Sequence, residues 1–125
     1  MVDYISDVPN APKAIGPYSP ATIANGFAFI SGQIPLDPAT GEMPSNIEAQ
    51  TEQVMKNLRA ILAHMKIDFS NVVKSTIFLT DLGNFAAVNS VYEKHLGQAR
   101  PARATVQVSA LPKGANVEIE MIAAI

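Results

Sequence analysis

The stretch that decides the fold is PARATVQV (Pro101–Val108), followed by the connection LPKGAN (Leu111–Asn116) and by VEIEMIA (Val117–Ala123). Two runs with strand-like residues flank a connection rich in Pro, Gly and Asn, so the pattern predicts strand, loop and strand. Successive side chains of a strand point to opposite faces, which places Arg103 on one face of the first run and Glu118 on one face of the second.

Charged side chains on mostly apolar strands cost desolvation free energy unless they meet water, each other or a ligand. Arg103, Thr105 and Gln107 share one face of their run, and Glu118 and Glu120 share one face of theirs. The pattern alone leaves two interpretations open, namely solvent-facing charge on a half-exposed sheet and a site that binds a ligand.

The N-terminal third contains an irregular segment and then a hairpin. Four prolines between Ser6 and Pro20 predict an extended segment without regular structure. The dipeptide Asn25-Gly26 lies between two β-prone runs, which predicts a tight two-residue turn with both residues at positive φ. The second strand runs out at Ser31-Gly32, where the glycine either ends the strand or permits another group to approach the backbone closely.

Two helices and a buried strand follow. Ser45 through Glu48 fits a capping box that starts a helix running to about Met65, with one apolar stripe. The β-branched run Val72–Thr80 predicts a central strand. Asn84 is placed to cap a second helix that ends at Gly97. The order predicts one α+β domain over residues 1–125, with both helices on one face of a mixed sheet and the other face unassigned.

Composition excludes several classes of function. The chain has 125 residues, a net charge of -2 and no cysteine, so it offers no basic field for nucleic acid, no disulfide and no thiolate nucleophile. No His, Asp and Glu cluster has metal-ligand spacing, and neither His64 nor His95 comes with an obvious acidic partner for a serine triad. Without a secretory signal or a membrane-spanning run, the expectation is a soluble cytoplasmic protein without a membrane partner.

Four separated motifs resemble the RidA/YjgF family of imine deaminases in order and spacing. They are AIGPYS (Ala14–Ser19), FISGQIP (Phe29–Pro35), DLGNFAAVN (Asp81–Asn89) and the C-terminal signature PAR, LPKG and VEIE that begins at Pro101. The resemblance covers essentially the whole chain.

The resemblance implies a chorismate-mutase-like fold, a homotrimer with a pocket at each subunit interface, and no metal or cofactor. It also implies hydrolysis of small 2-imino acids, such as 2-aminoacrylate and 2-iminobutanoate, to 2-oxo acids and ammonia. The substrate-binding residues that it implies are Tyr18, Ser31, Gly32, Asn89, Arg103 and Thr105. Arg103 would grip the substrate carboxylate and Glu118 would handle water and protons, which makes these two the catalytic pair. Thr105 stands where many of these deaminases carry cysteine, which affects the expected rate and substrate preference.

Two other functions are compatible with the resemblance or with the residues. One is an endoribonuclease that acts on single-stranded RNA, against which the acidic balance and the lack of an aromatic and basic groove both argue. The other is a module that binds a carboxylate metabolite without turnover.

Overall fold

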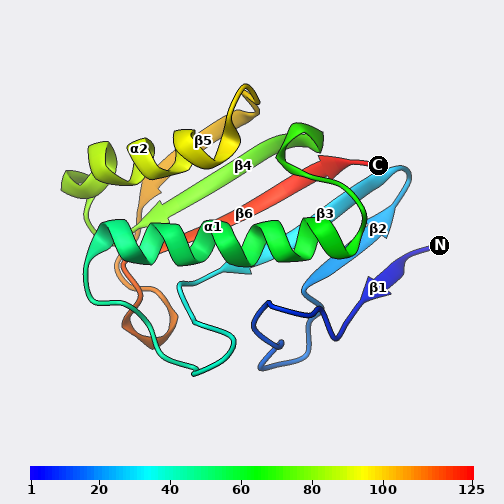
Figure 1. Cartoon of the computed structure of the whole chain (residues 1–125), viewed down its shortest axis with the longest axis horizontal. Coiled ribbons are helices and arrows are strands. Elements are labelled where there is room, and N and C mark those ends of the chain that lie inside the picture. The colour runs from blue at the N-terminus through cyan, green and yellow to red at the C-terminus, as the bar shows by residue number, and fades with distance from the viewer.

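The computed structural model describes residues 1–125, and it has two layers, in which two helices cover one face of a six-stranded sheet (Figure 1). The elements are β1 (Asp3–Ile5), β2 (Ala21–Ala24), β3 (Phe27–Gln33), α1 (Ile47–His64), β4 (Val72–Leu79), α2 (Phe85–Leu96), β5 (Ala102–Gln107) and β6 (Val117–Ala124). Short 3₁₀ turns occupy Phe69–Asn71, Leu82–Asn84 and Pro112–Gly114. The sheet order is β1-β2-β3-β6-β4-β5, with β4 and β5 parallel and every other pair antiparallel. The predicted α+β class, with both helices on one face of a mixed sheet, is confirmed.

The C-terminal strand β6 lies in the middle of the sheet. Both predicted C-terminal strands are present, but β4 lies between β5 and β6, so the two are not neighbours. Likewise β6 separates β3 from β4, the strands at either end of the crossover through α1. The three-residue strand β1, which pairs with β2, was not predicted because three residues are too few to show an alternating pattern.

The hairpin between β2 and β3 turns at Asn25-Gly26, as predicted. Asn25 has φ 51° and Gly26 has φ 80°, the conformation that this type of turn requires. The turn sets the register in which Thr22 pairs with Phe29. Residues 6–20 form no helix or strand, which confirms the irregular segment.

The helix ends agree with prediction in place but differ in chemistry. Asn46, and not Ser45, caps α1, because its side-chain Oδ1 accepts the Ala49 N–H at 2.8 Å. Asn84 makes no side-chain cap at the start of α2. Asp81 instead caps the short 3₁₀ turn before it by accepting the Gly83 N–H. Gly97, at φ 62°, ends α2 as predicted.

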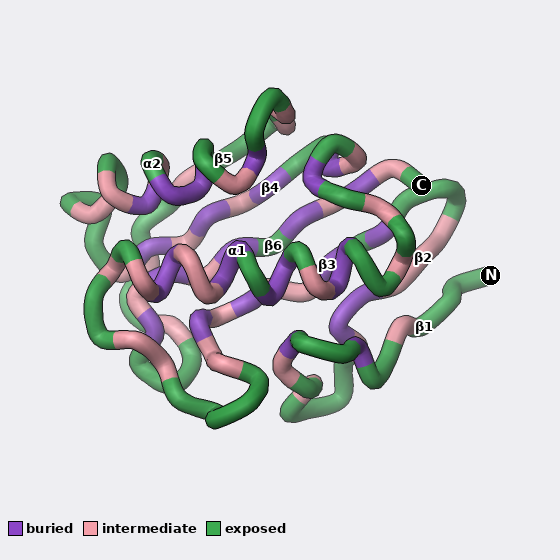
Figure 2. The backbone as a smooth tube through the Cα atoms, viewed as in Figure 1, coloured by how far each residue is buried: buried purple, intermediate pink, exposed green.

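The core lies between α1 and the central strands. Alternate residues of β6 are fully or nearly buried beneath the helices: Val117, Ile119, Met121 and Ala123. Figure 2 shows the buried stretches concentrated where the helices face β3, β6 and β4. Burial of an aliphatic side chain of this size stabilises the fold by roughly 1.5–3 kcal/mol, so these positions hold β6 in the sheet centre.

The opposite face of the sheet has no helix over it. The side chains that alternate with the core residues lie there, including Phe27 and Phe29, which are 41% and 44% exposed, and Val106 at 42%. Ile122, the register partner of Phe29, is half-buried on the same face. Part of this open face is therefore apolar, Glu118 and Glu120 of β6 also lie on it, and no helix covers it in the single chain.

Candidate functional site

Three side chains on one face of α2 surround Arg103. Phe85, Asn89 and Tyr92 are spaced i, i+4 and i+7, so they form one stripe along the helix. Asn89 Oδ1 accepts a hydrogen bond of 2.6 Å from Arg103 Nη1. The guanidinium carbon lies 5.4 Å from the centroid of the Phe85 ring and 5.2 Å from that of Tyr92. The arginine head is thus held by an amide and two aromatic rings.

The guanidinium of Arg103 has no carboxylate partner in the chain. The two ion pairs of the fold join His95 to Glu52 and Arg100 to Glu93, and neither involves this arginine. Its contact with Asn89 uses one of five N–H donors, and the residue is exposed on the edge strand β5. A positioned and unpaired guanidinium of this kind suits the recognition of a carboxylate through two parallel hydrogen bonds.

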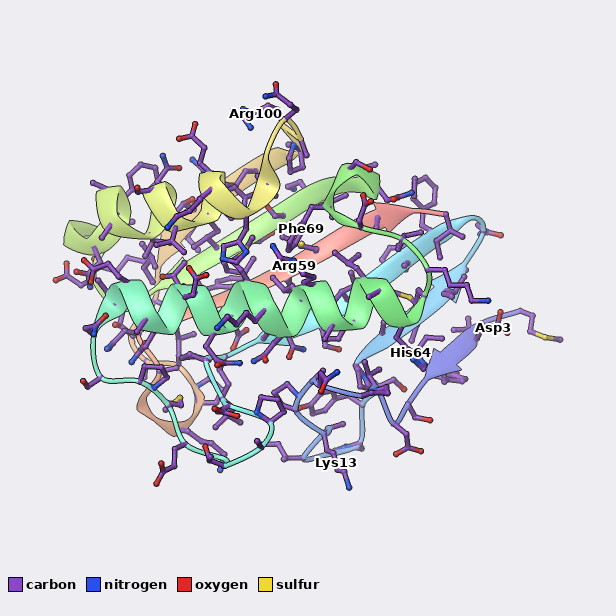
Figure 3. The ribbon with its side chains drawn as sticks, viewed as in Figure 1. Asp3, Lys13, Arg59, His64, Phe69 and Arg100 are labelled. Carbon is purple, nitrogen blue, oxygen red and sulfur yellow. The ribbon has the colours of Figure 1, made fainter.

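A cavity of about 380 Å³ opens beside Arg103. Its lining comes from α2 and from the segment leading into β5: Asn89, Tyr92, Glu93, Leu96, Arg100, Pro101 and Arg103. Arg100, labelled at the turn between α2 and β5 in Figure 3, is tied to the backbone carbonyls of Gly97 and Ala99 at 2.8 Å. The cavity therefore combines a free guanidinium with a second one that the chain already engages.

Behind Arg103 lies a buried pair of hydroxyls. Tyr92 is 3% exposed, Ser75 on β4 is 1% exposed, and their hydroxyl oxygens are 2.5 Å apart. Burial raises the pKa of Tyr92, an effect that the hydrogen bond with Ser75 and the charge of Arg103 partly oppose. Neither Tyr92 nor Ser75 was singled out as a site residue from the sequence.

Thr105 lies on the same face of β5 as Arg103, two residues further along. Its hydroxyl oxygen is buried and has no hydrogen-bond partner in the chain. Unpaired buried hydroxyls are uncommon in folded proteins, so this atom is a structural anomaly beside the site.

A second group of predicted site residues gathers at the bulge of β3. The pairing between β3 and β6 shifts between Ile30 and Gln33, which leaves Ser31 and Gly32 in the irregular part of the strand. A β-carbon added at Gly32 would collide with the carboxylate of Glu118. Of the two roles that the sequence allowed for Gly32, ending the strand or permitting close approach of another group, the structure shows the second, and the approaching group is the carboxylate of Glu118.

Ser31 and Tyr18 complete this second group, and they differ in how far their hydroxyls are already hydrogen-bonded within the chain. The Ser31 hydroxyl donates to the Ser19 carbonyl at 2.6 Å, so it holds the irregular segment against β3. Tyr18 lines a small cleft with Gly32, is 51% exposed, and its hydroxyl accepts one long bond of 3.4 Å from Ile15 N–H. Its hydroxyl is therefore free to donate to a ligand.

The carboxyl group of Glu118 is partly buried on β6. Burial raises its pKa, and the neighbouring Glu120 carboxylate raises it further. A carboxyl group whose pKa lies above the ordinary value is better suited to giving and taking a proton near neutral pH than an ordinary surface glutamate.

The two groups lie on opposite faces of the sheet. Arg103 pairs across the parallel ladder with Ser75, whose side chain faces the helices, whereas Glu118 pairs with Phe78, three residues further along β4. Because strand side chains alternate, an odd separation along β4 puts the two partners on opposite faces. One chain therefore brings Arg103, Asn89 and Thr105 together, and separately Tyr18, Ser31, Gly32 and Glu118.

His95 has an acidic partner, which corrects the expectation that it has none. Its Nε2 lies 2.8 Å from Glu52 Oε1 on α1, and its Nδ1 lies 2.8 Å from Arg59 Nη2. The sequence could not reveal this pair, because 43 residues separate the histidine from the glutamate. Both ring nitrogens are engaged in joining α1 to α2, so the histidine is not placed to activate a nucleophile.

No group of three or more His, Cys, Asp and Glu side chains is arranged to hold a metal ion. None of the helices has both the length and the apolar character needed to cross a lipid bilayer.

Comparison with known proteins agrees with this architecture. The model of the family described as Endoribonuclease L-PSP matches residues 8–125. Protein DfrA of Myxococcus xanthus is 62% identical over 116 residues, which cover 90% of this chain and 88% of DfrA. The 2-iminobutanoate/2-iminopropanoate deaminase of Capra hircus is 45% identical over 124 residues, covering 98% of this chain and 90% of the goat protein.

The fold is similar to solved structures as well. The Rid family protein YyfA of Yersinia pestis, described as a protein of unknown function, superimposes with a TM-score of 0.96 at 47% identity, and each chain is covered fully. A TM-score this high over the full length of both chains means that the two share one fold. The chain therefore belongs to the RidA/YjgF family.

Proposed function

We propose that this protein is a deaminase that hydrolyses small 2-imino acids to 2-oxo acids and ammonia. The observation that carries the proposal is the guanidinium of Arg103, which α2 holds in place while the chain offers it no carboxylate. A 2-imino acid brings the carboxylate that such a receptor binds. The goat relative that is named a 2-iminobutanoate/2-iminopropanoate deaminase supports the same chemistry.

The complete site forms between two copies of the chain in a homotrimer. Two features support this arrangement. The open face of the sheet leaves Phe27, Phe29 and Val106 partly exposed, which is the kind of apolar surface that subunit contacts cover. Arg103 and Glu118 lie on opposite faces of one sheet, so a second copy has to supply one member of the pair.

The reaction then needs one carboxyl group and one water molecule. Arg103 holds the substrate carboxylate through two parallel N–H donors, and the Gly32 N–H, Tyr18 and Asn89 orient the imine. Glu118 takes a proton from the water molecule while the water oxygen bonds to the imine carbon. The π electron pair of the C=N bond moves to the nitrogen. The protonated glutamic acid then gives its proton to that nitrogen. Glu118 then takes the proton of the new hydroxyl group and passes it to the amino nitrogen, and the C–N bond breaks as the C=O bond forms, so that ammonia leaves and the 2-oxo acid remains.

The direct test is ammonia release from 2-aminoacrylate or 2-iminobutanoate generated in the cuvette by a pyridoxal-phosphate-dependent dehydratase. Purified protein should accelerate release above the rate of hydrolysis in water, and Arg103→Ala should return the rate to that level. Equal rates with and without the protein would overturn the proposal. Binding of 2-oxobutanoate without acceleration would instead leave a carboxylate-binding module.

The same preparations test the ribonuclease alternative. Single-stranded RNA should remain intact in nuclease-free preparations of the wild-type protein. Cleavage that co-elutes with the protein and disappears in Arg103→Ala would favour the endoribonuclease over the deaminase.

A further inference from the structure

The contact between Arg103 and α2 has a buried, hydrogen-bonded side and an exposed side. Phe85, at the start of the helix, is 38% exposed, so its ring contacts the guanidinium from the solvent-exposed side. Tyr92, two turns further along, is 3% exposed and its hydroxyl is locked to the buried Ser75. The Tyr92 ring is therefore the rigid wall of the arginine site.

Ser75 connects Tyr92 to Arg103, because its side chain bonds the tyrosine and its backbone pairs with the arginine. Ser75 on β4 is the direct register partner of Arg103 on β5. The backbone that carries the arginine and the hydroxyl that anchors the tyrosine thus belong to paired positions of adjacent strands. A displacement of α2 that moved the ring away from Arg103 would have to break a buried hydrogen bond.

We infer that Tyr92 is a positioning residue, whose ring face, anchored by Ser75, orients the guanidinium of Arg103 for a substrate carboxylate. This inference rests on the proposed function, because the carboxylate is the substrate's. Arginine on an exposed edge strand samples many rotamers, and a ligand that selects one of them loses affinity. Asn89 accepts from one donor and the tyrosine ring lies 5.2 Å from the guanidinium carbon, while the remaining donors have no partner in the chain.

The ring and the hydroxyl of Tyr92 have different roles: the ring contacts Arg103, and the hydroxyl bonds Ser75. Tyr92→Phe alone would leave the buried Ser75 hydroxyl without its partner, so the informative variant is the double change Ser75→Ala with Tyr92→Phe. It keeps the ring and removes both hydroxyls. Ser75→Ala with Tyr92→Leu has the same background but lacks the ring.

The first measurement is binding of 2-oxobutanoate by calorimetry or by ligand-observed NMR. The ring-retaining double variant should bind within about twofold of the wild type, because the cation–π contact persists. The variant with leucine should bind about 3- to 30-fold more weakly, the range expected from loss of a cation–π contact at a partly exposed to desolvated site. In an Arg103→Ala background, exchanging phenylalanine for leucine at this position should make no further difference.

The second measurement does not depend on any ligand. The Arg103 Nε–H proton of the full-length protein should show a ring-current shift and restricted motion by NMR. The ring-retaining variant should keep both, and the leucine variant should lose both. A ring-retaining variant that loses them, or a leucine variant that keeps them, would overturn the inference.

Phe69→Leu is the matched control. Phe69 is 6% exposed and its ring lies 5.6 Å from the guanidinium carbon of Arg59, so it is another buried ring under an arginine (Figure 3). Its loss should lower the melting temperature without changing 2-oxobutanoate binding. An equal loss of binding in the control would mean that the leucine effect is general destabilisation, and would overturn the positioning role. Failure of ammonia release with the binding pattern intact would count against the proposed function alone.

Discussion

Arg103 and Glu118 project from opposite faces of the same sheet, with only β4 between their strands. The arginine turns toward α2, where Asn89 and Tyr92 hold it, and the glutamate turns away from the helices to lie against Gly32. A single chain therefore cannot apply both groups to one small substrate. The site that we propose for the deaminase therefore lies where two copies of the chain meet.

Subunit complementation follows from this geometry. Arg103→Ala and Glu118→Gln chains should each be inactive alone, but co-assembled chains should regain activity. In a cyclic assembly with random mixing of equal amounts, about a quarter of the sites receive arginine from one variant and glutamate from the other. The measurement is ammonia release from co-expressed, doubly tagged assemblies. Activity that stays at the level of the separate variants would mean that both residues come from one copy.

The assembly itself should be a homotrimer. Light scattering at micromolar concentration should give about three times the 13.3 kDa of the chain. Phe29→Glu places a charge on the open apolar face and should shift the mass toward that of the monomer. Lys94→Glu, on the exposed part of α2, changes charge as well and should leave the trimer intact. A wild-type protein that runs as a monomer would contradict the expectation.

Lysine should not replace arginine at position 103. Arg103→Lys keeps the positive charge but loses the planar fork that makes two parallel hydrogen bonds and stacks on the rings of Phe85 and Tyr92. Turnover of 2-iminobutanoate should fall severely, to a level near that of Arg103→Ala. A mild loss in Arg103→Lys would show that charge alone holds the carboxylate, and steady-state rates of the two variants decide this.

Glu118→Gln should separate binding from chemistry. Glutamine keeps the size and most hydrogen bonds of the glutamate but cannot accept a proton, so 2-oxobutanoate should still bind. Ammonia release should fall about 10²- to 10⁴-fold, the usual contribution of a general acid–base group. Glu120→Gln, an exposed neighbour on the same face of β6, is the control and should change turnover little. Normal turnover in Glu118→Gln would remove this glutamate from the mechanism.

The raised pKa of Glu118 also predicts how stability depends on pH. The folded chain binds this proton more tightly than the unfolded chain does, since burial and Glu120 raise the pKa. That stabilisation is complete below the unfolded value, near 4.5, and is lost as the pH rises through the folded pKa. The free energy of unfolding of Glu118→Gln relative to the wild type should therefore increase from acidic to neutral pH. Urea titrations at both ends of this range test the sign, and an unchanged or falling difference would contradict it.

Local signals in the sequence determined most of the elements. Asn25-Gly26 defined the hairpin because its turn requires positive φ at both residues, and Gly97 ended α2 for a similar reason. The alternation in the last strand correctly separated the core residues from Glu118. The predicted cap, Ser45, was wrong by one residue. Ser and Asn are about equally good caps, so the sequence did not distinguish Ser45 from Asn46, which caps the helix in the structure.

Only the tertiary structure decided which elements are neighbours. Nothing local in the last strand says that it inserts between β3 and β4, because that position depends on burying both its edges and its apolar face at once. The same holds for the partners of single residues: Glu52 reaches His95 across 43 positions, and Ser75 anchors Tyr92 across 17. The sequence pointed to Arg103 and Glu118 as candidate site residues. That they occupy opposite faces followed from their register against β4, a long-range property that strand alternation within each run does not contain.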